Sequence, residues 1–154
     1  MYTGMLHLHN LMRWVILVLL IINILRHITA MGKPFGAADK KLGLFAMIAA
    51  HITLLIGLYQ YFAGGLGIKL FQSMGMAAVM KDPVARFWAV EHLSGMLIGI
   101  VLITLARSVY RNSSSDAAKH RRALVLYVLA LAVIVAVIPW PGRTGIGRAL
   151  FPGM

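Results

Sequence analysis

The stretch LHLHNLMRWVILVLLIINILRH, residues 6–27, is apolar over most of its length and ends in the basic pair Arg26 and His27. A helix that crosses a lipid bilayer needs about 20 consecutive, mostly apolar residues. Three further stretches meet this requirement, and we expect helices over residues 42–62, 84–107 and 121–140. The sequence therefore predicts an all-α integral membrane protein with a single membrane domain, 1–154, folded as an up-down bundle of four transmembrane helices.

The composition of the chain excludes several classes of protein. With 60% hydrophobic and 12% charged residues in 154, the chain is too apolar for an ordinary soluble domain. The net charge of +11 comes from basic residues in short loops and at helix ends, so we predict contact with the lipid bilayer and no binding to nucleic acid. Cysteine is absent from the sequence, which excludes disulfides and thiolate-bound metal centres.

The ends of the predicted helices indicate an orientation. Basic residues are more frequent in the loops after the first and third helices than on the opposite side, nine against six. Cytoplasmic loops carry an excess of lysine and arginine, so both termini are predicted outside the cytoplasm. The first apolar stretch lacks a basic leader and a small-residue cleavage site, and we expect it to be retained as a helix.

Three histidines, His9, His51 and His92, lie inside predicted spans. An ionisable side chain in hydrocarbon is expensive and marks a functional site by default, and imidazole is a common ligand for haem iron, copper and zinc. At a rise of 1.5 Å per residue, His9, His92 and His51 lie about 5, 8 and 14 Å from the end that holds the termini. The first and third helices are diagonal in an up-down bundle. His9 with His92 is therefore the preferred ligand pair for one haem, and His51 with His92 is the second choice.

Two charged residues, Arg13 and Glu91, have similar predicted depths near these histidines. We expect the two side chains to form an ion pair. If haem is bound, Arg13 is instead expected to hold a haem propionate. Gly95 and Gly99 share a helix face with His92, and small residues there indicate close helix packing or room for a macrocycle. The remaining histidines have simpler interpretations: another helix face for His7, lipid headgroups for His27 and a basic loop for His120.

Several motifs of the sequence resemble a known family. They are LHNLMRW at 8–14, Ala50-His51, the run MKDPVARFWAVEH at 80–92, and IPWP at 138–141. In these motifs the chain resembles small bacterial four-helix membrane proteins that are catalogued as cytochrome-b-like. The resemblance covers nearly the whole chain. It implies a b-type haem with histidine ligands, matched by position to His9, His51 and His92, and a location in a bacterial inner membrane. With the orientation that the basic residues indicate, both termini would lie in the periplasm.

The leading prediction is thus a cytochrome b-like protein that binds one haem b for electron transfer, with quinone or respiratory-complex subunits as candidate partners. One alternative is a non-enzymatic structural or assembly subunit of a larger membrane complex. Another is a copper or zinc site built from His9, His51 and His92. The sequence contains no nucleophile–base set, HExxH motif or phosphate loop. Whether the chain is an enzyme therefore stays open.

Overall fold

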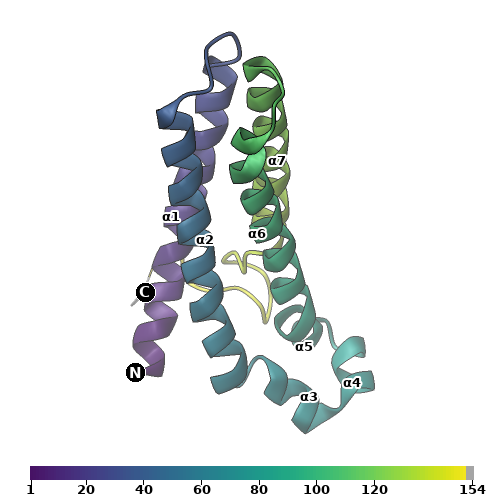
Figure 1. Cartoon of the computed structure of the whole chain (residues 1–154). Coiled ribbons are helices and arrows are strands. Elements are labelled where there is room, and N and C mark those ends of the chain that lie inside the picture. The colour runs from purple at the N-terminus through teal and green to yellow at the C-terminus, as the bar shows by residue number, and fades with distance from the viewer. Residues whose placement is uncertain (152–154) are drawn as a thin grey trace.

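A computed structural model describes residues 1–151 as an all-helical protein without strands over that range (Figure 1). Four of its helical segments are long and apolar enough to cross a membrane. They are α1 (Tyr2–Thr29), α2 (Ala37–Ala63), α7 (Asp116–Val137) and a composite rod. The rod consists of α5 (Pro83–Arg86), the π-helical turn η1 (Phe87–Glu91), α6 (His92–Ser108) and the short 3-10 turn η2 (Val109–Arg111). The predicted all-α, four-helix membrane bundle is confirmed.

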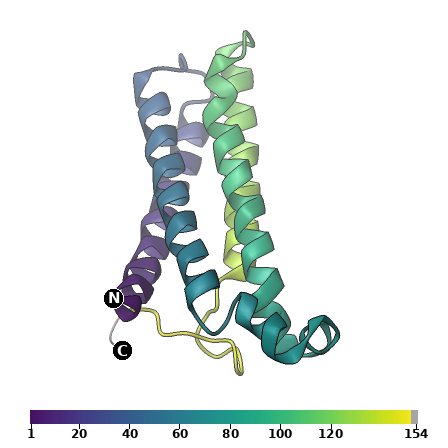
Figure 2. The ribbon, with the colours of Figure 1, turned by 60° about the horizontal axis from the view of Figure 1, so that its bottom comes forward.

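The four long helices run alternately up and down (Figures 1 and 2). α1 packs against α2 and α7, and α6 packs against the same two helices. α1 and α6 therefore occupy diagonal corners, as the up-down arrangement predicts. We call the end that holds the N-terminus the lower end and the opposite end the upper end, as they appear in Figure 1.

Each helix buries a stripe with helical spacing. On α1 the stripe consists of Ile16, Leu20, Asn23 and His27, and on α7 it consists of His120, Ala123, Tyr127, Ala130 and Ile134. Residues three and four apart share one helix face, so these stripes meet in the bundle core.

Gly95 and Gly99 show how closely α6 and α7 approach. A Cβ atom added at Gly95 would lie 2.4 Å from Val137 Cγ1, and one at Gly99 would lie 2.6 Å from Ile134 Cγ1. Carbon atoms normally approach to about 3.5–4.0 Å. The two glycines thus serve helix packing, the first of the two roles that their spacing indicates.

Three helices, α1, α2 and α7, begin four or five residues before the predicted starts, and polar caps extend two of them. α2 begins at Ala37 because the Asp39 carboxylate accepts a hydrogen bond from the Gly36 backbone N–H at 2.8 Å. α7 begins at Asp116, where the Ser115 hydroxyl accepts from the Ala118 N–H at 3.3 Å. His120 is therefore a helical residue, and its predicted loop position is wrong.

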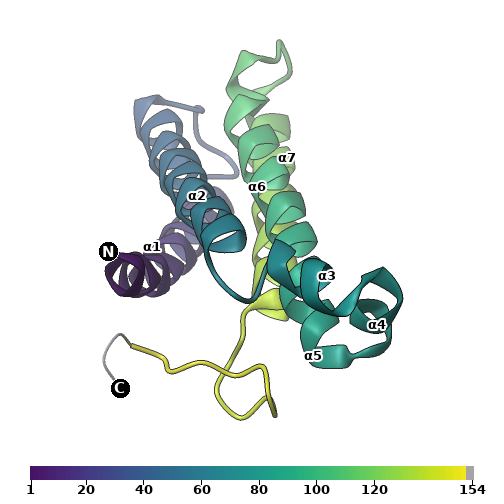
Figure 3. The ribbon, with the colours of Figure 1, turned by 90° about the horizontal axis from the view of Figure 1, so that it is seen from below.

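The lower end carries the irregular parts of the chain. Two short helices, α3 (Ile68–Met74) and α4 (Met76–Lys81), link α2 to α5 beside the bundle. The segment after α7 crosses below the bundle towards α1 (Figure 3). It is attached there by the side chains of Asn10 and Trp14, which donate hydrogen bonds to the carbonyls of Ala149 and Leu150 at 3.2 and 2.8 Å.

Candidate functional site

A cavity of about 570 Å³ opens at the lower end between α1, α2, α6 and the C-terminal segment. Its volume lies in the range of small-molecule and cofactor pockets, about 300–1,000 Å³. Much of the wall is apolar, and its polar part includes His9, Asn10, Arg13, Thr53, Gln60, Trp88, His92 and Arg148. Three of the four predicted site residues, His9, Arg13 and His92, therefore line one cavity.

His9 from α1 and His92 from α6 face this space from diagonal helices. Their ring centroids lie 6.3 Å apart, with an interplanar angle of 69°. The Nδ1–H of His92 donates to the Val137 carbonyl at 2.8 Å, since a carbonyl can only accept. This fixes the tautomer and leaves Nε2 free, which is the usual way in which a metal-binding histidine is oriented.

His9 lies against α2 at Gly57, which has no side chain. A Cβ atom at Gly57 would approach His9 Cε1 to 3.1 Å, so glycine leaves the room that this imidazole needs. The Nδ1 atom of His9 is buried and has no hydrogen-bond partner within residues 1–151. A buried polar atom without a partner costs about 1–3 kcal/mol, so this histidine carries unused bonding capacity.

The helical rod that contains His92 changes from a π-helix to an α-helix directly before this residue. The π-helical turn Phe87–Glu91 precedes His92, and its Ala89 carbonyl accepts a hydrogen bond from the Tyr61 hydroxyl at 3.2 Å. Single π-helical turns are frequent at functional sites. The turn brings Trp88 to 5.8 Å from His92, measured between ring centroids.

Arg13 and Glu91 do not pair, so the expected ion pair between them is wrong. Glu91 instead accepts from Arg86 Nε at 2.7 Å, on the same rod. Arg13 donates to the carbonyls of Ala149 and Leu150, because the C-terminal segment folds back beneath α1. Its Nε atom is buried and unpartnered within the described chain.

Arg148 is a cavity cation that the sequence reasoning missed. Its guanidinium lies 4.9 Å from the ring centroid of Trp88 and lines the cavity with Arg13. Only the path of the C-terminal segment brings it there, and its position in the sequence gives no signal of this.

His51 is not brought to the cavity. Its side chain is exposed on the outer face of α2, and its Nδ1–H donates to the Met47 carbonyl of its own helix at 2.8 Å. It is not among the residues that line the cavity. The structure therefore joins His9 and His92 without the third histidine.

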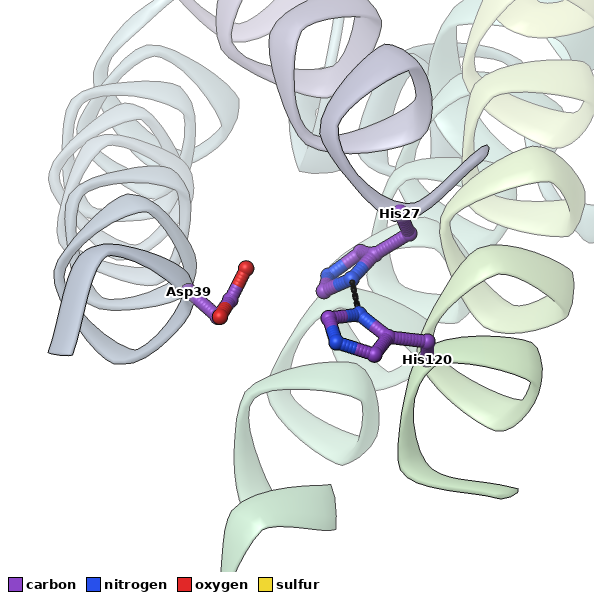
Figure 4. Close-up of side chains that lie close together, drawn as sticks. All are labelled: His27, Asp39 and His120. Carbon is purple, nitrogen blue, oxygen red and sulfur yellow. Dashed lines mark hydrogen bonds between the residues drawn. The ribbon is translucent and has the colours of Figure 1, made fainter. Parts of the chain in front are cut away.

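A second polar cluster lies at the upper end, where His27 and His120 are 1% and 0% exposed (Figure 4). Their Nδ1 atoms are 2.9 Å apart in a hydrogen bond, and one ligand atom from each ring and from Asp39 all lie within 4.8 Å of one another. The assignment of His27 to lipid headgroups is wrong, because both histidines fall on the buried stripes of α1 and α7. For His27 the spacing of four from Asn23 is the signal in the sequence.

Comparisons with protein-family models, with curated proteins and with solved structures gave no match to this chain. The functional argument therefore rests on the geometry of the two histidine clusters.

Proposed function

We propose that this chain is a cytochrome b-like membrane protein that binds one b-type haem between His9 and His92 and transfers electrons. The observation that carries the proposal is the pair of imidazoles, one from each diagonal helix, that line a single cavity 6.3 Å apart. Imidazole is a common axial ligand of haem iron.

The spacing of the rings supports this choice. Metal–imidazole bonds are about 2 Å long, so two rings on opposite sides of one metal have centroids about 6 Å apart. The observed separation of 6.3 Å is close to this value. His51 is not needed for such a pair, and its exposed position on α2 supports leaving it out.

The chemistry of the wall also suits haem, which combines an apolar macrocycle with two carboxylates. Residues such as Leu54, Met96 and Ile100 provide apolar surface. Arg13 and Arg148 provide guanidinium groups, which bind carboxylates through two parallel hydrogen bonds. Arg13 Nε and Trp88 Nε1 have no hydrogen-bond partner within residues 1–151, and they mark polar positions that a ligand can satisfy.

A bound haem supplies reversible one-electron transfer. The protein would hold it through His9 and His92, keep the His92 ring in place through the Val137 carbonyl, and neutralise the propionates with Arg13 and Arg148. The apolar part of the wall would lower the polarity around the haem, which affects the potential of such a centre.

The proposal includes a location. The bacterial inner membrane is the location that the resemblance implies, and the distribution of basic residues, nine against six, favours an orientation with both termini in the periplasm. The cavity would then lie near the periplasmic surface, where quinone or a respiratory-complex subunit is the expected electron partner.

The test is a reduced-minus-oxidised absorbance spectrum, with iron analysis, of protein purified in mild detergent from cells with a full haem supply. We expect sharp α and Soret bands at one iron per chain. His9→Ala and His92→Ala should abolish them, and the matched control His51→Ala should retain them. A wild type without a Soret band would refute the proposal. Bound copper or zinc in place of iron would favour a metal-ion protein, and a stable partner without any cofactor would favour an assembly subunit.

A further inference from the structure

We propose that His27, Asp39 and His120 form a binding site for one divalent transition-metal ion of the zinc type at the upper end of the bundle. The site is independent of the proposed haem. His27 follows His9 by 18 residues on the same helix, which corresponds to about 27 Å along its axis. Three different helices, α1, α2 and α7, each contribute one ligand.

The donor set is one that zinc uses. Zinc binds imidazole nitrogen and carboxylate oxygen, commonly through three protein ligands with a water at the fourth position. The ligand atoms of the three residues lie within 4.8 Å of one another. Figure 4 shows the two imidazoles side by side, with the carboxylate of Asp39 facing their free edges.

A second observation points to a ligand at this place. The Nε2 atom of His120 is buried and has no hydrogen-bond partner within residues 1–151, although the residue as a whole is 0% exposed. Buried polar side-chain atoms nearly always have a partner. A metal ion would satisfy this nitrogen.

The surrounding residues hold the ligands in place. The Asp39 carboxylate accepts from Arg26 Nε at 2.7 Å and from the Gly36 N–H at 2.8 Å. A carboxylate offers about four lone-pair positions, so it can keep these bonds and still bind a metal. The His27 ring is stacked with Phe35 and with Tyr127, and both centroids lie 5.8 Å away. Such outer partners are a regular feature of metal sites.

The distance between the two rings selects a bare ion over a larger group. With Nδ1 atoms 2.9 Å apart, a macrocycle does not fit between the imidazoles. Two nitrogens on a tetrahedral zinc lie about 3.3 Å apart, given bonds of about 2.0 Å. Ligation by both rings, through the free Nε2 of His120 and one nitrogen of His27, therefore requires a small movement that brings these two nitrogens to about this distance. It replaces the hydrogen bond between the two Nδ1 atoms with two metal–nitrogen bonds.

The test uses the full chain carrying His9→Ala and His92→Ala, so that the imidazole pair of the lower cavity cannot contribute ligands. Zn²⁺ is titrated against a chromophoric chelator, and Co²⁺ is used as a spectroscopic probe. We expect one tight site per chain and the visible absorption of tetrahedral Co²⁺. His27→Gln, His120→Gln and Asp39→Asn should each weaken binding by more than the factor of about 10–100 that is typical for loss of an outer partner. His51→Ala, which removes an exposed histidine that does not line the lower cavity, is the matched control.

The failure of this proposal and the failure of haem binding are distinguishable. If the His9/His92 variant binds no Zn²⁺, or if the three cluster variants bind it as tightly as the parent, the metal site is wrong, whatever the haem spectrum shows. Should a cluster variant not fold, X-ray absorption of the Zn²⁺-loaded parent decides. Two imidazole nitrogens and one carboxylate oxygen support the site, and a metal without imidazole ligands overturns it.

Discussion

Gly95→Ala tests the close approach of α6 and α7 that positions His92. The added methyl group would lie 2.4 Å from Val137 Cγ1, 3.0 Å from its Cγ2 and 3.1 Å from its Cβ. All three atoms are too close, so no rotation of the Val137 side chain clears the space. With the Val137 rotamer kept, the helices must move apart by about 1 Å to restore an ordinary carbon–carbon contact of about 3.5 Å.

The expected change in the free energy of unfolding of Gly95→Ala is the sum of two opposing contributions. Replacing glycine by alanine within a helix gains up to about 1 kcal/mol, and overpacking a close contact costs about 1–3 kcal/mol. Gly4→Ala is the control, because a Cβ atom at Gly4 of α1 meets nothing within 4 Å. The free energy of unfolding of Gly95→Ala should therefore lie about 1–3 kcal/mol below that of Gly4→Ala.

The assay is unfolding of the purified protein in mixed micelles by a denaturing detergent, followed by circular dichroism. Val137→Ala supplies the second half of a double-mutant cycle, and it should remove most of the Gly95→Ala penalty if the clash is its cause. Equal stabilities of Gly95→Ala and Gly4→Ala, or a penalty that Val137→Ala leaves unchanged, would refute the reasoning. In a haem-bound protein, Gly95→Ala should also perturb the spectrum, because the Val137 carbonyl orients His92.

Other perturbations test the remaining contacts. Arg26→Ala should lower the free energy of unfolding by about 1–3 kcal/mol, because the buried Asp39 carboxylate loses its charged partner and keeps only the Gly36 N–H. Glu91→Gln should change it by only about 0–1 kcal/mol, since both side chains of the Arg86–Glu91 pair are more than one-third exposed. Trp14→Ala should release the C-terminal segment by removing the stack on Phe151 and the bond to the Leu150 carbonyl, measured as faster tryptic cleavage after Arg148. An unchanged unfolding curve for Arg26→Ala, or an unchanged cleavage rate for Trp14→Ala, would contradict the assigned contact. For Glu91→Gln the contradicting result is a loss of several kcal/mol.

Much of the architecture could be predicted from local sequence. Four apolar stretches of membrane-spanning length determine four helices, because backbone groups in hydrocarbon must be paired within the helix. Short connections then make the helices antiparallel, and the diagonal placement of His9 and His92 follows from the order of the helices and the depth of each residue. These inferences need only composition, length and periodicity.

The tertiary structure alone decided which polar groups meet. The partner of Arg13 could not be inferred from its depth, because a backbone segment more than 130 residues away folds beneath it. His27 and His120 lie at the ends of their helices, where sequence alone equally suits a headgroup contact. They pair because α1 packs against α7 and polar caps extend α2 and α7. Periodicity reports which face of a helix is buried, whereas the identity of the neighbour on that face depends on contacts between distant parts of the chain.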